Sequence, residues 1–489
     1  MTVTAGRAAK GKSAARASGR GPARAAQAEQ LSRADRAALG KDARAAAPLE
    51  SHGEFRPGQS RDPVGLLLGQ GESRVRELVP VRHGRMLVSP FTFYRGAALP
   101  MAADLATTPA SGLRVQLCGD AHLSNFGAFA SPERRLVFDV NDFDETLPGP
   151  FEWDVKRLAA SFAVAGRDSG FPARARRKIA LAAAEGYRTA MRGFAQQPFL
   201  DVWYAHLDIE PALEEFRSRV KASRFKAAQA LLAKAHTRDS TQALRKLTTI
   251  TGGQRRIISD PPMIVAIEEI FADIQAAELY EQLRAILAKY RRTLQSDRRH
   301  LLGQFTLVQV ARKVVGVGSV GTRAWVLLMD ACDGVEPLFL QAKEAQPSVL
   351  AEYCGRSQYN NQGERVVAGQ HLMQAQSDIF LGWTRVTGPD GIDRDYYIRQ
   401  LRDWKFSVPI EQMVPAGLTV YARLCGWTLA RAHARSGDRI ALAAYLGGSA
   451  RFDQAIADFA ETYADQNEND YAALQAAVKD GKAEAATEI

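Results

Sequence analysis

Two short polar stretches in the first third of the chain carry residue types that suit metal binding or chemistry on a hydroxyl group. The first contains Asp120, His122 and Asn125, and the second contains Asp142 and Asp144. Carboxylate and carboxamide oxygens are good ligands for hard cations such as Mg²⁺, and a carboxylate can also position a hydroxyl nucleophile. The two stretches therefore predict a cation site, or a nucleophile-positioning site, at the place where they meet.

The sequence around these stretches indicates how they are brought together. An apolar run at residues 113–117 precedes the first stretch, and another at 136–138 precedes the second. Short apolar runs of this kind are typical of strands. A strand that ends at the first loop and a hairpin that returns to the second would place both side by side. Pro and Gly at 148–150 then mark a turn, and Asp154 lies where a helix N-cap is expected.

A glycine-rich stretch occurs much further along the chain. Gly316, Gly318 and Gly321 match G-x-G-x-x-G between two extended runs, residues 305–315 and 322–329. A dinucleotide-binding fingerprint would open a helix here, because the helix N-terminus holds the pyrophosphate. This loop instead joins two expected strands, which is the geometry of the protein-kinase loop that covers ATP phosphates. A plain glycine turn in a hairpin is the alternative.

A lysine follows this loop at the place that nucleotide binding requires. Lys343 lies in a third, largely apolar run, residues 337–345, and a lysine in a buried strand needs an anionic partner. In protein kinases such a lysine holds ATP phosphates and pairs with a glutamate on the following helix. Glu352 and Glu364 are both candidates for that glutamate, and the sequence does not choose between them. A snorkelling lysine in an ordinary hairpin is the alternative.

The first two stretches resemble motifs of known small-molecule kinases. Gly119–Asn125 is similar to the catalytic loop of aminoglycoside phosphotransferases, written H-G-D-x-H-x-x-N, with Cys118 in place of the first His. Asp142-Phe143-Asp144 resembles their metal-binding segment. Asp154 resembles a further acidic residue that this family has just after that segment.

The resemblance implies a role for each matching residue. Asp120 would position the acceptor hydroxyl and, in one interpretation, deprotonate it. His122 would brace the loop rather than take the proton. Asn125 and Asp142 would bind Mg²⁺, with Asp144 as a second acidic ligand.

The motifs occur in an unusual order. In kinases the glycine loop and the lysine precede the catalytic loop, whereas here they follow it. The helical run 418–434, which ends in Ala432-His433-Ala434, is similar to the helix that normally leads into the catalytic loop. We therefore predict an α+β chain with a two-lobed, circularly permuted protein-kinase-like fold. It would have a helix-rich large lobe and an antiparallel-sheet nucleotide lobe. Permutation is tolerated where natural termini lie close together at the surface.

Composition along the chain gives the expected boundaries. The Ala- and Arg-rich composition of residues 1–55 predicts a disordered basic tail. Residues 60–303 are expected to form the large-lobe part with the catalytic loop and helices, and residues 304–405 the nucleotide-binding small lobe. Residues 406–478 would complete the large lobe as C-terminal helices, and residues 479–489 would form a polar tail.

Most of the chain after residue 60 is also similar to a bacterial family catalogued as domain of unknown function 2252. The similar segments are Arg85-Met86, Ser89-Pro90-Phe91, Phe93-Tyr94-Arg95-Gly96, Cys118–Asn125, Asn141–Glu145 and Gln341–Ala345. This resemblance implies no established activity, so function has to be argued from the site.

Charge and cysteine content narrow the class of protein. Of the formal net charge of +10, residues 1–50 contribute +6, with ten Lys/Arg against four Asp/Glu. The rest of the chain is close to neutral and does not predict specific nucleic-acid binding. Four cysteines without a C-x-x-C pair are typical of a reduced, cytoplasmic protein. No apolar stretch approaches the roughly 18 residues needed to cross a bilayer, and no secretory signal is expected.

Together these features predict an ATP-dependent phosphotransferase that uses ATP and Mg²⁺ to modify an unknown hydroxyl-bearing acceptor. Two other classes remain open. One is a nucleotide-binding protein, or one that transfers the adenylyl group. The other is a Mg²⁺-dependent hydrolase that uses Asp120, His122, Asp142 and Asp144, with a merely structural glycine loop. The sequence predicts neither the acceptor nor the oligomeric state.

Overall fold

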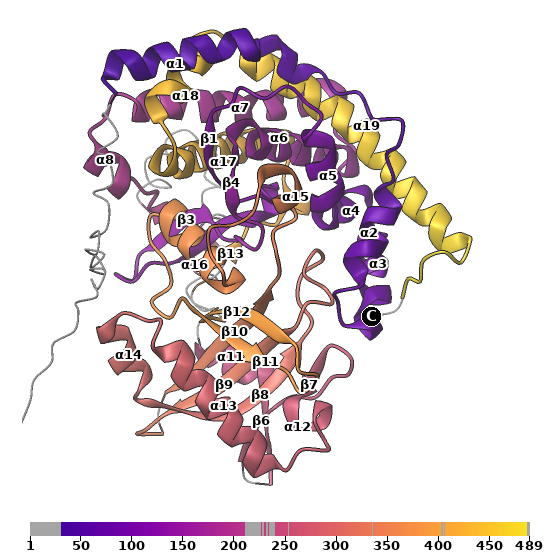
Figure 1. Cartoon of the computed structure of the whole chain (residues 1–489), viewed down its shortest axis with the longest axis vertical. Coiled ribbons are helices and arrows are strands. Elements are labelled where there is room, and N and C mark those ends of the chain that lie inside the picture. Colours follow the sequence, from indigo (N-terminus) through magenta and orange to yellow (C-terminus); the bar gives the residue numbers. More distant parts are fainter. Residues whose placement is uncertain are drawn as a thin grey trace, which may run out of the picture.

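The computed structural model describes residues 31–210 and 240–486, except 253, 335, 402, 403 and 405, together with residues 226, 229, 230 and 233. One part of the molecule is helical, and the other is an antiparallel sheet with its own helices (Figure 1). The predicted α+β class is confirmed. None of the described helices is both long and apolar enough to span a bilayer.

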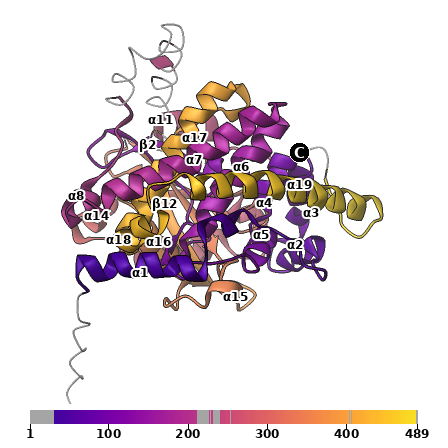
Figure 2. The ribbon, with the colours of Figure 1, turned by 90° about the horizontal axis from the view of Figure 1, so that it is seen from above.

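The helical part is built from segments at both ends of the described chain (Figures 1 and 2). Its elements are α1 (Arg33–Ala46), η1 (Leu49–Gly53), α2 (Pro63–Gly71), η2 (Arg76–Leu78), α3 (Val79–Met86), α4 (Pro90–Gly96), α5 (Ala98–Leu105), α6 (Phe151–Asp168), α7 (Ala173–Phe194), α8 (Phe199–Tyr204), η5 (Ile410–Gln412), α17 (Pro415–Ser436), α18 (Arg439–Leu446) and α19 (Arg451–Lys479). α17 packs along α7, and α19 packs along α6. Glycine permits the first contact, because a Cβ atom at Gly426 would lie 2.1 Å from the carbonyl oxygen of Ala183. The late helices therefore share one core with the early ones.

The sheet region contains six antiparallel strands in the order β11-β12-β10-β9-β8-β7. Its elements are α11 (Ser240–Leu247), β5 (Thr248–Thr251), β6 (Gln254–Ile257), β7 (Ile264–Ala266), α12 (Ile267–Ile270), α13 (Ala276–Arg291), α14 (Ser296–Leu302), β8 (Phe305–Lys313), β9 (Ala324–Ala331), β10 (Pro337–Ala345), α16 (Gln362–Met373), β11 (Gly382–Thr387) and β12 (Asp393–Gln400). The short α15 (Ala351–Cys354) follows β10 in the sequence but packs against the core of the helical part (Figure 1). Side chains alternate between the two faces of a strand. Leu340 and Ile398 lie on the face that packs against α13, so Phe339 and Lys343 lie on the other.

Two small sheets hold the polar loops. They contain β1 (Arg114–Leu117) with β4 (Leu147–Pro150), and β2 (Phe126–Ala130) with β3 (Leu136–Val140) and β13 (Phe406–Ser407). The first polar loop, with the short η3 (Leu123–Asn125), runs from β1 to β2, and the second runs from β3 to β4. Leu117 is opposite Leu147, and Phe126 is opposite Val140. Both loops therefore connect the same two sheets and lie side by side.

The folded part starts earlier than the sequence predicts. Residues 1–30 lie outside the described residues, but α1 is an ordered helix where the tail was expected to be disordered. It begins with a capping box formed by Ser32 and Asp35. Gly40 contacts α18 so closely that a Cβ atom there would lie 2.0 Å from the carbonyl oxygen of Ala441. The Ala/Arg-rich composition resembles a disordered tail, but docking on α18 supplies the burial that such a segment lacks by itself.

The sheet region also starts earlier than residue 304, and the range 60–303 is not wholly part of the helical body. The elements from α11 to α14 pack on the sheet, and β7 pairs with β8 at its edge. β5 and β6 form a hairpin in a range expected to contain helices and a loop but no strand. These strands have only three or four residues, so they leave little period-2 pattern to detect.

The end of the chain is likewise more ordered than the expected polar tail of residues 479–489. After α19 the chain returns to α3, where the backbone N–H of Ala486 donates to the carbonyl oxygen of Pro80 at 2.9 Å. Ala483 is buried in a small apolar cluster with α2 and α4. Residues 487–489 lie outside the described residues.

Candidate functional site

The two polar loops contact each other directly. Gly119 has φ +82°, in the region that favours glycine, and a Cβ atom there would lie 2.4 Å from the carbonyl oxygen of Glu145. The backbone N–H of Asn141 donates to the carbonyl oxygen of Asn125 at 2.9 Å. The structure thus brings the two predicted stretches into one site.

Asp154, in the first turn of α6, fixes the start of the first loop. α6 begins at Phe151, so Asp154 is not the N-cap that the sequence predicts. Its carboxylate instead accepts hydrogen bonds from the backbone N–H groups of Cys118 at 2.8 Å and Gly119 at 3.0 Å, and it lies 3.2 Å from Nε2 of buried His433. Position 118 contributes its backbone to this contact, so a Cys there is compatible with the loop geometry.

A buried arginine holds Asp120. Oδ1 of Asp120 accepts from Nε of Arg157 at 2.6 Å and lies 2.5 Å from Nη2. The guanidinium is held in turn by the carbonyl oxygen of Tyr94 at 3.1 Å. Oδ2 of Asp120 lies 3.7 Å from Nε2 of His122, and the side chain is 20% exposed. This contact orients the carboxylate while leaving it accessible.

His122 and Asn125 stabilise the loop around Asp120. Burial, together with the positive charges of Arg95 and Arg157, lowers the pKa of His122 to about 3, although Asp120 acts in the opposite direction. The imidazole is therefore neutral near pH 7, which supports a bracing role. Nδ2 of Asn125 donates to the carbonyl oxygen of Asp120 at 2.8 Å. The amide oxygen of Asn125 takes no part in this hydrogen bond.

The second loop meets the sheet at Lys343. Nζ of Lys343 lies 2.5 Å from Oδ2 of Asp144, a residue 199 positions away in the sequence. Tyr397, opposite Lys343 on β12, donates its hydroxyl to Oδ1 of Asp144 at 2.6 Å. Burial opposes the charge of Lys343, but the attraction of Asp144, together with smaller contributions from Tyr397 and Asp142, outweighs it, so the pKa of Lys343 is raised. The backbone N–H of Asp144 also donates to Oδ1 of Asp142 at 3.2 Å.

The structure gives Lys343 a carboxylate partner other than the expected glutamate. Among the described residues, Lys343 forms its ion pair with Asp144 and with neither Glu352 nor Glu364. Glu352 is exposed on α15. From α16 it is buried Arg365 that reaches this region, where Nη2 donates to the carbonyl oxygen of Asp144 at 2.8 Å. Which side chain of α16 faces the sheet depends on how the helix docks, which is a long-range property.

The glycine-rich loop is held next to this pair. Gly316 has φ +70° and Gly321 has φ +88°, conformations that glycine adopts without strain. A Cβ atom at Gly318 would lie 3.1 Å from the carbonyl oxygen of Arg95. Nη1 of Arg85 donates to the carbonyl oxygen of Gly316 at 2.7 Å. The loop therefore packs against the segment that precedes the first polar loop.

A cavity of about 80 Å³ lies where these parts meet. Four of the predicted site residues line it, Asp120, Asp142, Asp144 and Gly318, together with residues from three separate regions of the chain. Its lining residues include Gln70, Arg74, Arg82, Arg95, Asp120, Asp142, Asp144, Glu145, Gly318, Ser319, Thr322, Glu344 and Gln346. Asp120 thus shares one cavity with both predicted metal-binding carboxylates and with the glycine loop.

The oxygen donors of this cavity fit a hard divalent cation that shares its coordination with a substrate. Asp142 and Asp144 bring carboxylates to the cavity, and Asn125 offers an amide oxygen nearby in the first loop. In the described part of the chain, no group of three or more His, Cys, Asp or Glu residues is arranged to hold a metal. Mg²⁺ commonly binds through one or two carboxylates and completes its shell with water and substrate phosphates. These residues therefore fit Mg²⁺ bound together with a nucleotide.

Comparison with known proteins identifies the family. A family model described as an uncharacterized protein conserved in bacteria (DUF2252) matches residues 74–477. The chain belongs to this family. No curated protein and no solved structure matches it. The matched range of this DUF2252 protein contains both polar loops, the glycine loop and Lys343.

Several residues of the candidate site lie outside the predicted set, among them Arg157, Tyr397 and Arg365, each of which forms a hydrogen bond with a predicted residue. Arg157 follows Asp154 by three positions, so both lie on one face of α6. This spacing could have predicted that Arg157 belongs to the site. Tyr397 reaches Asp144 because β12 pairs with β10 in one particular register, which the sequence does not reveal. Arg365 depends on the docking of α16 in the same way.

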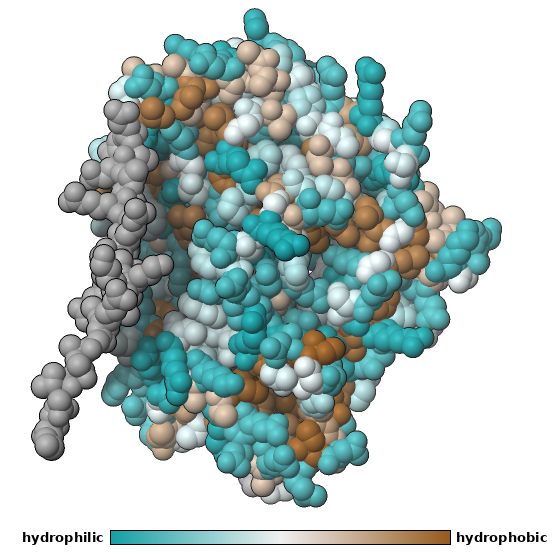
Figure 3. All heavy atoms as spheres, in the orientation of Figure 1, coloured by the Kyte–Doolittle hydropathy of each residue, from teal (hydrophilic) through white to brown (hydrophobic). Residues whose placement is uncertain are grey.

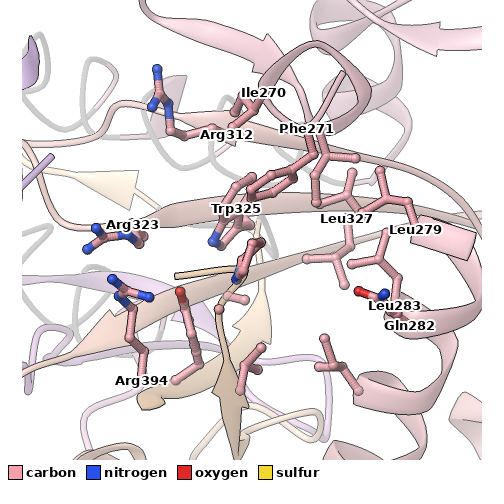
Figure 4. A pocket seen from close by; sticks show the side chains of 18 of the residues that line it. Ile270, Phe271, Leu279, Gln282, Leu283, Arg312, Arg323, Trp325, Leu327 and Arg394 are labelled. Atoms are coloured by element: carbon pink, nitrogen blue, oxygen red, sulfur yellow. The ribbon is translucent and has the colours of Figure 1, made fainter. Parts of the chain in front are cut away.

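A larger cavity, of about 420 Å³, lies on the opposite face of the sheet (Figure 4). Its lining is mainly apolar and includes Phe271, Leu283 and Trp325. Ala342 lines it, so strand alternation directs Lys343 away from it. Around β11 and α13, hydrophobic residues gather at the surface (Figure 3). This cavity contains none of the predicted site residues, so we assign the candidate active site to the smaller one.

Buried histidines should make the protein sensitive to acid. Burial lowers the pKa of both His52 and His122 to about 3, below the value of about 6.5 in an unfolded chain. As the pH falls through 6.5 the unfolded state binds protons that the folded state excludes, so stability present above pH 6.5 is lost progressively towards pH 3. Each histidine should lower the free energy of unfolding by about 2 kcal/mol between pH 7 and pH 5.

Urea unfolding at a series of pH values measures this effect. In His52→Asn the dependence on pH should be shallower than in the unchanged protein. The exposed His300→Asn controls for the substitution itself. An unchanged pH dependence in His52→Asn would contradict the assignment of a neutral buried histidine.

Proposed function

We propose that this DUF2252 protein is an ATP-dependent phosphotransferase with a circularly permuted, two-lobed protein-kinase-like architecture. The contact between Lys343 and Asp144 carries the proposal. It joins a strand lysine that follows a glycine loop to the acidic loop beside Asp120. Phosphoryl transfer asks a protein mainly for charge neutralisation at the phosphates and for placement of the nucleophile. In this arrangement the partner of Lys343, Asp144, lines the same cavity as Asp120.

The position of α17 supports the permutation. This helix resembles the one that leads into the catalytic loop in kinases, and its end lies against β1, the strand that leads into the first polar loop. The backbone N–H of Gln116 donates to Oγ of Ser436 at 3.2 Å, and a Cβ atom at Gly437 would lie 2.6 Å from Cγ1 of Val115. A direct connection between α17 and β1 would therefore restore the usual kinase order with little movement.

Each residue has a task in this proposal. The backbone of the glycine loop and the ammonium group of Lys343 bind phosphate oxygens of ATP. Asp142, Asp144 and Asn125 hold Mg²⁺, which neutralises phosphate charge when bound. Asp120, fixed by its arginine, orients the acceptor hydroxyl.

The proposed reaction is an in-line displacement at the γ-phosphorus. A bond forms between the acceptor oxygen and phosphorus while the bond from phosphorus to the departing ADP oxygen breaks. The acceptor proton passes to Asp120 or to solvent. His122, neutral and buried, holds the loop in place during this exchange.

ATP with Mg²⁺ should raise the melting temperature, and Lys343→Ala should remove that increase. A ligand present at 100 times its Kd stabilises the folded state by about 2.7 kcal/mol, which a thermal melt detects. Lys343→Ala also loses a buried ion pair, so the compared quantity is the ATP-induced shift and not the melting temperature itself. Lys289→Ala, on the solvent-exposed side of α13, is the matched control. An equal shift in Lys343→Ala would exclude the proposed nucleotide site.

Isotopic labels separate phosphoryl transfer from the other reactions. With ATP labelled at the γ-phosphate, the label should leave the nucleotide, whereas a label at the α-phosphate should stay. Release of the α-label to an acceptor would mean adenylyl transfer. Hydrolysis of a simple phosphoester that is indifferent to ATP would favour the metal-dependent hydrolase.

A further inference from the structure

Three arginines line the candidate site without an acidic partner. Arg74, Arg82 and Arg95 all border the cavity that contains Asp120. Arg74 is 8% exposed and Arg82 is 1% exposed. In the described part of the chain, no carboxylate lies within ion-pair distance of any of the three guanidinium groups. Buried charges in proteins are normally paired, so this cluster needs an explanation.

Some buried nitrogen atoms of these arginines also lack a hydrogen-bond partner among the described residues. Arg82 donates from Nη2 to Oε1 of Gln70 at 2.5 Å and to the carbonyl oxygen of Gly96 at 3.1 Å, but its buried Nε and Nη1 have no partner among the described residues. Nη1 of Arg74 donates to the carbonyl oxygen of Val320 in the glycine loop, and its buried Nε has no hydrogen-bond partner in the described part of the chain. The guanidinium group of Arg95 makes no hydrogen bond to any described residue, and its Nε is buried. Burial lowers the pKa of Arg74 to about 10.

The other charges of the cavity leave a positive excess. Three carboxylates are paired: Asp120 with Arg157, Asp144 with Lys343, and Glu344 with Arg323. Among the described residues, neither Asp142 nor Glu145 forms an ion pair. Three unpaired guanidinium groups thus face at most two unpaired carboxylates. An anionic group entering the cavity would find a net attraction.

The segment that carries these arginines lies between the glycine loop and the first polar loop. The backbone N–H of Val75 donates to the carbonyl oxygen of Gly321 at 2.8 Å, and the backbone of Arg95 packs against Gly318. Asp120 is the carboxylate that attracts the Arg95 side chain most strongly. A ligand held by these arginines would therefore lie next to the point of transfer.

We propose that Arg74, Arg82 and Arg95 bind a dianionic, phosphate-type group, and that the acceptor carries this group. The inference rests on the proposed function, because it takes Asp120 as the point of transfer. Arginine presents a planar fork of donors that matches phosphate oxygens. Lys343, the glycine loop and Mg²⁺ already serve the nucleotide phosphates, so a second cationic set serves a second anion. The acceptor is then a small phosphorylated alcohol.

Inorganic phosphate is the probe for this site. Thermal melts are recorded with phosphate or with potassium chloride at equal ionic strength, each with and without Mg²⁺ and an ATP analogue that has an uncleavable β–γ link. Phosphate should raise the melting temperature in both cases. Arg95→Gln should weaken phosphate binding by about 10- to 100-fold and leave the shift by the analogue unchanged. The exposed Arg451→Gln controls for the change in charge.

Arg82→Met provides a second, independent measurement. It removes a buried charge that has no partner, so without phosphate its melting temperature should equal or exceed that of the unchanged protein, while the phosphate shift should disappear. A merely structural arginine would give the opposite result, a lower melting temperature with the phosphate shift retained.

The remaining outcomes overturn the inference in distinguishable ways. No phosphate shift in the unchanged protein, with a normal shift by the analogue, rejects the anion site and leaves the proposed function standing. A phosphate shift that vanishes once the analogue is bound, with weaker analogue binding in Arg95→Gln, assigns the arginines to the nucleotide and rejects the phosphorylated acceptor. If phosphate raises the melting temperature but the ATP analogue does not, the proposed function is rejected instead.

Discussion

Replacing Asp120 with Asn should lower the rate of γ-phosphate release from ATP by about 10²- to 10⁴-fold. Asn has the same shape and can still accept a hydrogen bond from Arg157, so the loop should keep its position. What it lacks is the negative charge that orients the attacking hydroxyl and attracts its proton. The loss should therefore fall on the rate of turnover, with little change in the thermal shift produced by ATP and Mg²⁺.

The measurement is release of γ-labelled phosphate, to water when no acceptor is added. Asp390→Asn is the matched control, because it makes the same change at an exposed ion pair in the hairpin between β11 and β12. Asp120→Asn with full turnover would remove Asp120 from its proposed role. A variant that loses ATP binding as well as turnover would show that Asp120 acts on nucleotide binding rather than on the acceptor.

The arrangement of the candidate site could be predicted from the sequence where it depends on neighbouring residues. The stretch that contains Asp120 and Asn125 is a single loop, so its side chains converge whatever the rest of the chain does. The glycine loop was distinguished from a dinucleotide fingerprint by the strands on either side of it. Lys343 followed from the same strand pattern, since a lysine in a buried strand requires an anion.

The partners of these residues could not be predicted in the same way. The kinase-like interpretation predicts that the strand of Lys343 lies close to Asp142 in the second loop, but no local pattern selects Asp144 as the partner of Lys343. Tyr397 joins them through strand register. Arg82 was also inaccessible to prediction, because an arginine in a helical segment is usually solvated and only the folded structure shows that this one is buried.

The predicted boundaries of the folded part and of the sheet region differ from those in the structure for a related reason. α1 has the composition of a disordered tail, yet its capping box and its contact with α18 make it part of the fold. The helices before β8 have ordinary amphipathic patterns, which do not reveal whether they pack on helices or on a sheet. In both cases local pattern predicts an element, and the long-range partner decides which part of the molecule it joins.

The buried ion pair between Asp139 and Arg431 should be the most sensitive point in the stability of the site. Asp139 lies on β3, just before the second polar loop, and Arg431 lies on α17; their side chains are 4% and 1% exposed. Asp139 also accepts from the backbone N–H of Ala375 at 3.1 Å, and Nη1 of Arg431 donates to the carbonyl oxygen of Met373 at 2.7 Å. The pair thus joins the acidic hairpin, the end of α16 and the late helix.

Arg431→Met should lower the free energy of unfolding by about 3–5 kcal/mol, because it leaves the Asp139 carboxylate buried without its counter-charge. Burial already raises the pKa of Asp139, and Arg431 opposes that increase, so the variant should bind a proton more readily on folding. Its stability relative to the unchanged protein should therefore improve as the pH falls. Urea unfolding at pH 7 and pH 5 measures both effects.

The same helix offers a matched control. Arg423, also on α17, pairs with Glu185 on α7 at 2.8 Å, and these side chains are 57% and 43% exposed. Arg423→Met should cost less than about 1 kcal/mol, because water screens an exposed pair. The double variant Asp139→Asn/Arg431→Met should lose less than the sum of the single variants, since neither charge is left alone. Equal costs for Arg431→Met and Arg423→Met would mean that the pair does not secure the contact between the late helix and the acidic hairpin.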